Sequence, residues 1–160
     1  MKGRLALIAA GAAVVTAGVA FMRKEGDRPL VIDDARYLRL TSYREDGSQA
    51  SRPVWFVQRN GVIEITTPEA SKKVAQIAND PRVEIVASDM RGKVDDDAEH
   101  LTGVARIVRG EASDEIFEAI KAKYGWQGKV AEKVYGARAR AGNELYATRV
   151  GLRIVLTERL

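Results

Sequence analysis

The chain has 160 residues, 46% of them hydrophobic and 30% charged, which suits a single globular domain. It contains no cysteine, so disulfides, thiolate catalysis and cysteine-based metal sites are excluded. The formal charge is +4, but residues 1–24 carry four basic residues and no acidic one, which leaves 22 residues of each sign in residues 25–160. A neutral domain of this kind argues against nucleic-acid binding.

An uncharged stretch from Leu5 to Phe21, extended by Met22, has about the minimum length of a membrane-spanning helix. The basic residues that flank it are Lys2, Arg4, Arg23 and Lys24. They favour a retained anchor, whereas the small residues at 15–17 keep a cleaved signal peptide open. We expect a single-pass anchor at residues 1–24, a linker at 25–34 and a domain at 35–160. Basic residues on both sides leave the orientation open; the expected side of the domain is the cytoplasm.

Alternating apolar and polar residues predict strands at 37–43, 49–58, 62–66, 82–88, 100–108 and 149–157. Asp46-Gly47 and Asn60-Gly61 predict tight hairpin turns between the first three strands. Pro53 indicates an edge position or a bulge, because proline cannot donate to the strand ladder. Gly103 indicates a bulge or a close contact in the fifth strand.

Three helices are expected between these strands. Thr67-Pro68-Glu69 predicts a helix start, with Thr67 as the N-cap and Pro68 at the first helical position. Residues 112–124 form an amphipathic pattern, and 126–140 allow a further short helix. Antiparallel strands with helical connections predict a mainly β (α+β) fold, a six-stranded antiparallel barrel with helical crossings.

A possible anion site follows the third predicted strand. Ser71, Lys72 and Lys73 lie near the start of the predicted helix, where free backbone amides and the helix dipole favour a negative charge. A solvated lysine pair on the helix surface is the competing interpretation.

A possible ring-binding wall lies in the second predicted strand. Trp55 and Phe56 point to opposite faces, so one enters the core while the other faces a cleft, a partner or solvent. Next to Pro53, the backbone amides of Val54 and Trp55 are free to meet a ligand. The anion site and this strand together suggest a phosphorylated, flat cofactor.

Other chemistry has less support. His100 is the only histidine, which argues against a structural zinc site but leaves haem ligation as an alternative. The acidic run at 95–97 lacks the spacing of a calcium loop. No Gly-x-Ser-x-Gly elbow is present, so serine-nucleophile chemistry has no recognisable motif.

In order and spacing, these segments resemble the pyridoxamine 5'-phosphate oxidase-like split β-barrel proteins, and within them the flavin/deazaflavin-dependent oxidoreductase branch. The resemblance covers residues 35–158. It is carried by Tyr37–Tyr43, Gly47, Ser51–Phe56, Thr67, Ser71–Lys73, Asn79–Val83, Arg91-Gly92, Gly103–Arg106 and Lys123–Gly125.

The resemblance implies a homodimer with FMN-binding-like cofactor sites at the subunit interface. Lys73 matches the phosphate-binding lysine of the family, and Ser71 matches its hydroxyl partner. The cofactor-binding residues that it implies are Pro53, Val54, Trp55, Thr66, Thr67, Ser71, Lys73 and Arg91. Many relatives have glycine where this chain has Lys72 and arginine where it has Gln76, which leaves deazaflavin F-420 and FMN both open as cofactors.

The expected function is that of a membrane-anchored oxidoreductase that transfers a hydride to a small conjugated substrate. No catalytic acid or base residue and no metal ligand is expected, because the cofactor ring itself carries the hydride. The alternatives are a non-catalytic flavin- or haem-binding split-barrel protein and a haem-degrading relative.

Overall fold

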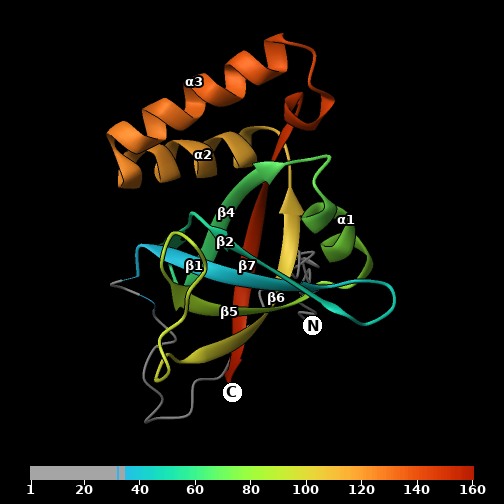
Figure 1. The fold of residues 1–160 in the computed structure, drawn as a ribbon, viewed down its shortest axis with the longest axis vertical. Coiled ribbons are helices and arrows are strands. Elements are labelled where there is room, and N and C mark those ends of the chain that lie inside the picture. The colour runs from blue at the N-terminus through green and yellow to red at the C-terminus, as the bar shows by residue number, and fades with distance from the viewer. Residues whose placement is uncertain (1–31, 33–34) are drawn as a thin grey trace, which may run out of the picture.

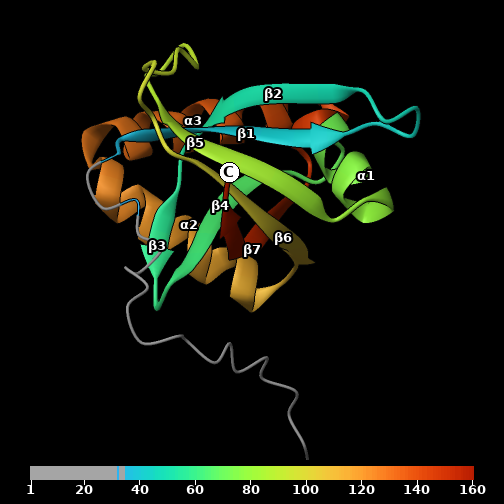
Figure 2. The same cartoon turned by 90° about the horizontal axis from the view of Figure 1, so that it is seen from below.

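The computed structural model describes residue 32 and residues 35–160, and within them seven strands form one curved antiparallel sheet. The strands are β1 (Tyr37–Tyr43), β2 (Gln49–Val54), β3 (Val57–Arg59), β4 (Val62–Pro68), β5 (Arg82–Ser88), β6 (His100–Val108) and β7 (Arg149–Arg159). Their order across the sheet is β2-β1-β5-β6-β7-β4-β3. Figure 2 shows the sheet curving so that β1, β2 and β5 form one side and β3 and β4 lie across from them.

The expectation of six strands is wrong, because the second predicted strand is divided. β2 ends at Val54 and β3 begins at Val57, yet these consecutive strands form opposite edges of the sheet. β2 pairs with β1, and β3 pairs with β4. Between them the Phe56 N–H donates to the Tyr124 hydroxyl at 3.1 Å instead of joining a ladder. Pro53, which lacks an N–H, lies just before this break.

Three α-helices and one short 3-10 helix connect the strands in the described part of the chain. They are α1 (Lys72–Asn79), α2 (Glu111–Tyr124), α3 (Trp126–Arg140) and η1 (Glu144–Tyr146). Helix α1 connects β4 to β5, while α2, α3 and η1 all lie between β6 and β7. In Figure 1, α2 and α3 lie together at one end of the molecule, with α3 outermost.

Helix α1 begins later than the sequence predicts. Ser71, not Thr67, is its N-cap residue, and Thr67 and Pro68 belong to β4. Pairing with β7 explains the difference: Thr67 lies opposite Val150, and the Glu69 N–H still donates to the Thr148 carbonyl at 2.9 Å. Strand pairing therefore continues past the residues whose local preference is to start a helix.

The main core fills the inside of the curved sheet. Its most deeply buried side chains include Leu38, Leu40, Phe56, Ile63, Ile65, Ile85, Leu101, Leu152 and Ile154. Gly103 lies at a register shift between β6 and β7, which confirms the predicted irregularity. A Cβ atom there would lie 2.8 Å from both the Ile154 Cγ2 atom and the Val155 carbonyl oxygen. Glycine is therefore required because the strands approach closely.

The expected N-terminal anchor and linker lie outside the described residues, except for Ile32. Within residue 32 and residues 35–160, no helix combines the length and apolar character needed to cross a membrane.

Candidate functional site

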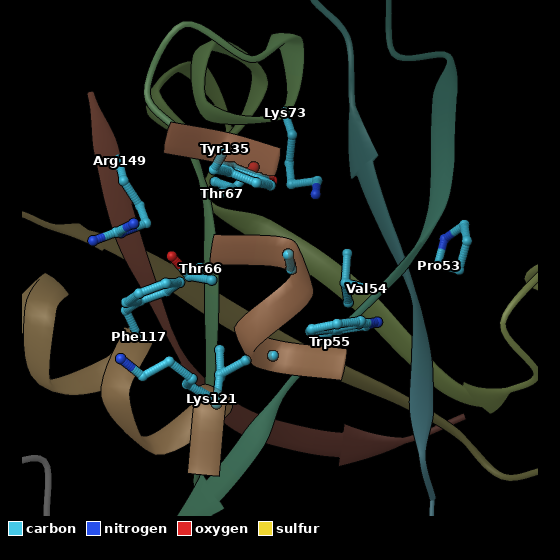
Figure 3. Close-up of a pocket in the computed structure, with 13 residues that line it drawn as sticks. Pro53, Val54, Trp55, Thr66, Thr67, Lys73, Phe117, Lys121, Tyr135 and Arg149 are labelled. Carbon is cyan, nitrogen blue, oxygen red and sulfur yellow. The ribbon is translucent and has the colours of Figure 1, made fainter. Parts of the chain in front are cut away.

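A cavity of about 270 Å³ opens between the end of β2, the end of β4 and the two helices α2 and α3 (Figure 3). The lining residues are Pro53, Val54, Trp55, Thr66, Thr67, Lys73, Phe117, Ile120, Lys121, Gly128, Ala131, Tyr135 and Arg149. The structure thus brings together most of the residues that the sequence analysis selected as cofactor-binding. They come from the edge strand β2 and the residue after it, from β4, and from the helix that follows β4.

An aromatic stack forms one wall. The Trp55 ring lies parallel to the Tyr124 ring, with 4.4 Å between centroids and 8° between planes. The Tyr124 hydroxyl donates to the Arg36 carbonyl at 2.6 Å and accepts from the Phe56 N–H. Burial raises the pKa of Tyr124 to about 12, which keeps the phenol protonated at neutral pH. Helix α2 thereby fixes the plane of Trp55 at the edge of the cavity.

Lys73 supplies a positive charge to the cavity. It extends from the first turn of α1 into the cavity, beside Thr67 (Figure 3). Burial, followed by the charge of Arg52, lowers its pKa from 10.5 to about 8. Among the described residues no carboxylate forms an ion pair with it. Burial of an unpaired cation is costly, so an anion in the cavity would stabilise Lys73.

Lys72 has a different environment. It is exposed and lines a separate surface hollow with Arg44 and Gln76. The side chain of Gln76 accepts a hydrogen bond from the Ser42 hydroxyl at 2.7 Å. Of the two neighbouring lysines, only Lys73 can therefore reach a ligand in the cavity.

Hydroxyl groups surround the place where an anion would bind. The Thr67 Oγ1 and Ser71 Oγ atoms lie 3.3 Å apart, and the Ser71 side chain makes no capping bond to α1. Two further polar atoms next to the cavity, Thr66 Oγ1 and Arg149 Nε, are buried without a hydrogen-bond partner in the described part of the chain. Buried polar atoms are nearly always bonded, so these two suggest a ligand or water that completes the site.

The remaining lining residues come from segments that sequence reasoning did not connect to the site. The Arg149 guanidinium lies 3.6 Å from the centre of the Phe117 ring. Helix α3 packs closely on α2 at Gly128, where a Cβ atom would lie 2.9 Å from the Lys121 Cα atom. The same helix brings Tyr135 to the cavity, and burial raises the pKa of Tyr135. The only sequence signal for this part of the site was Gly128, because a glycine within a helical pattern indicates close packing against a neighbouring element.

Three residues discussed from the sequence do not line the cavity. Ser71 is outside the lining although its hydroxyl lies 3.3 Å from that of Thr67, and Arg91 is exposed in the loop between β5 and β6. That loop still touches the site, since a Cβ atom on Gly92 would lie 3.3 Å from the Pro53 Cδ atom. His100 lies at the start of β6, away from the cavity lining. In the part of the chain that the structure describes, no group of three or more possible metal ligands occurs.

Solved structures with a similar fold include a conserved hypothetical protein, Rv2991, from Mycobacterium tuberculosis, with 26% identity and a TM-score of 0.56 over 79% of this chain and 76% of that one. An F-420 reductase has 17% identity and a TM-score of 0.54, over 79% of this chain and 90% of that one. The haem storage protein HutZ from Vibrio cholerae has 14% identity and a TM-score of 0.53, over 78% and 84%.

No curated protein sequence matches this chain. A family profile described as pyridoxamine 5'-phosphate oxidase matches residues 30–151, which include β1 to β6, the start of β7, the helices and every residue of the cavity lining. The fold of the similar structures agrees with that match. The chain therefore belongs to the pyridoxamine 5'-phosphate oxidase family of split β-barrels.

Proposed function

We propose that the protein is an oxidoreductase that binds FMN or deazaflavin F-420 in this cavity and transfers a hydride to a small conjugated substrate. The observation that carries the proposal is that the buried cation of Lys73, which has no ion-pair partner among the described residues, lines the same cavity as the stacked ring of Trp55. A cofactor with a phosphate and a flat ring matches both features. The similarity to an F-420 reductase supports the fold but does not select between the two cofactors.

The phosphate of such a cofactor fits the end of the cavity near α1. Lys73 supplies the charge and Thr67 supplies a hydroxyl donor, while the Ser71 hydroxyl contacts Thr67 from outside the lining. A bound phosphate would raise the pKa of Lys73 again, because the opposite charge favours the protonated amine.

The flat ring fits between the aromatic and the basic sides of the cavity. Trp55 provides a rigid apolar wall, and it lies outside both neighbouring strand ladders. Arg149, whose Nε atom has no hydrogen-bond partner among the described residues, lies at the opposite end beside Phe117. When bound, the cofactor supplies the hydride chemistry, while this chain orients the ring, places positive charge near it and limits the access of water.

The volume of the cavity is relevant to whether one chain can enclose a complete cofactor. About 270 Å³ lies just below the usual range of roughly 300–1,000 Å³ for ligand pockets. Part of a complete cofactor would therefore extend beyond the walls of one chain. We propose a homodimer in which the second subunit covers this part, and a membrane anchor at residues 1–24 that keeps the dimer at a membrane.

The test is a titration of the purified full-length protein with FMN, F-420 and haem, followed by absorbance, fluorescence and native mass spectrometry. Lys73→Met should weaken binding of the phosphorylated cofactor by about 10- to 150-fold, the equivalent of a charge-assisted hydrogen bond worth roughly 1.5–3 kcal/mol. Lys72→Met is the matched control and should leave binding unchanged, because Lys72 faces away from the cavity. Failure to bind either cofactor, or equal effects of both variants, would refute the proposal.

Turnover distinguishes an enzyme from a non-catalytic binding protein. With the reduced cofactor bound, one equivalent of a quinone acceptor should reoxidise it by taking up the two electrons, and this should require an intact Trp55 wall. A cofactor that stays bound but exchanges no electrons would favour the non-catalytic alternative. Haem binding that disappears in His100→Ala would favour the haem-binding alternative.

A further inference from the structure

Helix α3 has two apolar faces. Gly128, Ala131 and Tyr135 line the cavity on one face. On the other face Trp126 and Val130 expose 72% and 51% of their surface, and Val134 exposes 40%. Residues four apart lie on the same side of a helix, so these three side chains form one continuous stripe, which we call the outer stripe. Figure 1 places α3 at the end of the molecule, outside α2.

Basic residues border the outer stripe. Helix α3 contains Lys129, Lys133, Arg138 and Arg140 but only one acidic residue, Glu132. At 100° per residue, Lys129, Lys133 and Arg140 lie along one border of the stripe. The carboxylate of Glu132 lies 3.4 Å from the Lys121 Nζ atom of α2, toward the cavity side. The outward surface of α3 therefore combines an exposed tryptophan, two valines and net positive charge.

The N-terminal chain enters the domain beside this helix. The Arg36 side chain donates to the Gln127 side chain at 2.6 Å, and the Lys123 amine donates to the Ala35 carbonyl at 3.4 Å. The apolar stretch at residues 5–22 is joined to this point by residues 23–34, which reach at most about 40 Å. If that stretch lies in a bilayer, the start of α3 remains within reach of its surface.

We propose that α3 is an interfacial helix whose outer stripe inserts into the headgroup region of an anionic bilayer. Tryptophan and basic residues bordering an apolar stripe are typical of helices that lie in the plane of a membrane surface. Contact between α3 and the same helix of a second copy would be less favourable, because the only acidic residue of α3 already contacts Lys121. In this arrangement a single helix separates the cavity from the lipid, which would let an apolar substrate approach from the membrane.

Trp126 provides a direct probe, because Trp55 is the only other tryptophan. The full-length protein is reconstituted in vesicles of phosphatidylcholine and phosphatidylglycerol, with part of the phosphatidylcholine brominated in the upper acyl chain. The difference in emission between the wild type and Trp126→Phe isolates the signal of Trp126. We expect the brominated lipid to quench this signal, and iodide in the aqueous phase to leave it largely unquenched.

The charge contribution is tested with Lys129→Gln/Lys133→Gln. Each lysine near an anionic surface contributes about 1 kcal/mol, so the pair should shift the ratio of docked to undocked domain about 30-fold and restore quenching by iodide. Lys72→Gln/Lys93→Gln removes the same charge from exposed positions outside α3 and should keep the lipid quenching.

Two outcomes would overturn the proposal. In the first, Trp126 stays accessible to iodide and is unaffected by brominated lipid. In the second, it is protected from iodide without any quenching by lipid, and the protection increases with protein concentration. The second outcome would assign the outer stripe to contact between copies of the chain.

Discussion

Ligand binding in the cavity should weaken as the pH rises above about 8, because Lys73 then loses its proton. In the ligand-free protein its pKa is about 8, below the usual 10.5, chiefly because the amine is buried. A bound phosphate favours the charged amine, so binding above pH 8 takes up a proton. Affinity should then fall up to about tenfold per pH unit. Full recovery of the usual pKa sets an upper limit of roughly 300-fold, and about 10- to 100-fold is expected because the amine stays buried beside the phosphate and regains only part of its usual pKa.

The assay measures the dissociation constant of the bound cofactor from pH 7 to 10 by fluorescence. Lys73→Met should bind more weakly at pH 7 and show a much smaller pH dependence above pH 8. An equal pH dependence in the wild type and the variant would refute the assignment of the phosphate to Lys73.

Unfolding of the ligand-free protein gives a second measurement of the same pKa. Between pH 8 and 10.5 the unfolded chain binds more protons at Lys73 than the folded chain does. The free energy of unfolding should therefore rise with pH in this window. Lys73→Met should remove that contribution.

Three further changes test the architecture. Tyr124→Phe leaves the buried Phe56 N–H without its acceptor and should lower the free energy of unfolding in urea by about 1–3 kcal/mol. The control Tyr146→Phe removes an exposed hydroxyl bonded to Arg138 and should lower it by less than about 0.5 kcal/mol. Equal losses for the two variants would contradict the structural role of Tyr124. Gly103→Ala should lower stability by about 1–3 kcal/mol, since its Cβ would press on the neighbouring strand, and an unchanged unfolding midpoint would argue against this contact. Trp55→Leu should raise the dissociation constant of a flat cofactor about 2- to 12-fold in the same fluorescence titration and leave the affinity for inorganic phosphate unchanged. An equal loss of affinity for both ligands would argue against Trp55 as a wall for the ring.

Local sequence signals predicted most of the sheet. Strong alternation placed β1, β5 and β6 with their observed bounds, and Asn60-Gly61 forms the expected turn with positive φ at both residues. The sequence pattern failed where tertiary pairing overrides local preference. Thr67 and Pro68 have helix-start chemistry, but pairing with β7 keeps them in a strand. The pairing strand lies more than eighty positions away in the sequence, so the local residue pattern does not reveal it.

The same limit applies to the site: residues within one local motif were identified from the sequence, and residues placed by contacts between distant segments were not. Lys73 and Trp55 were found because their own segment predicts a helix start and a strand beside it. Arg149 was missed because its place beside the site depends on the pairing of β7 with β4, and Tyr135 was missed because it reaches the cavity only after α3 packs on α2. Their positions depend on contacts between elements, such as the close packing at Gly128, that short-range periodicity does not encode.

The strands β2 and β3 are the two edges of the sheet, and only two residues, Trp55 and Phe56, connect them along the chain. These edges belong to one continuous stretch of chain, but no ladder pairs them with each other. The cavity lies along this junction. Contacts with Tyr124 replace the missing ladder here, since its ring stacks on Trp55 and its hydroxyl accepts from the Phe56 N–H. The distance between the two edges at the cavity therefore depends on one side chain of α2 and on the burial of Phe56 in the core.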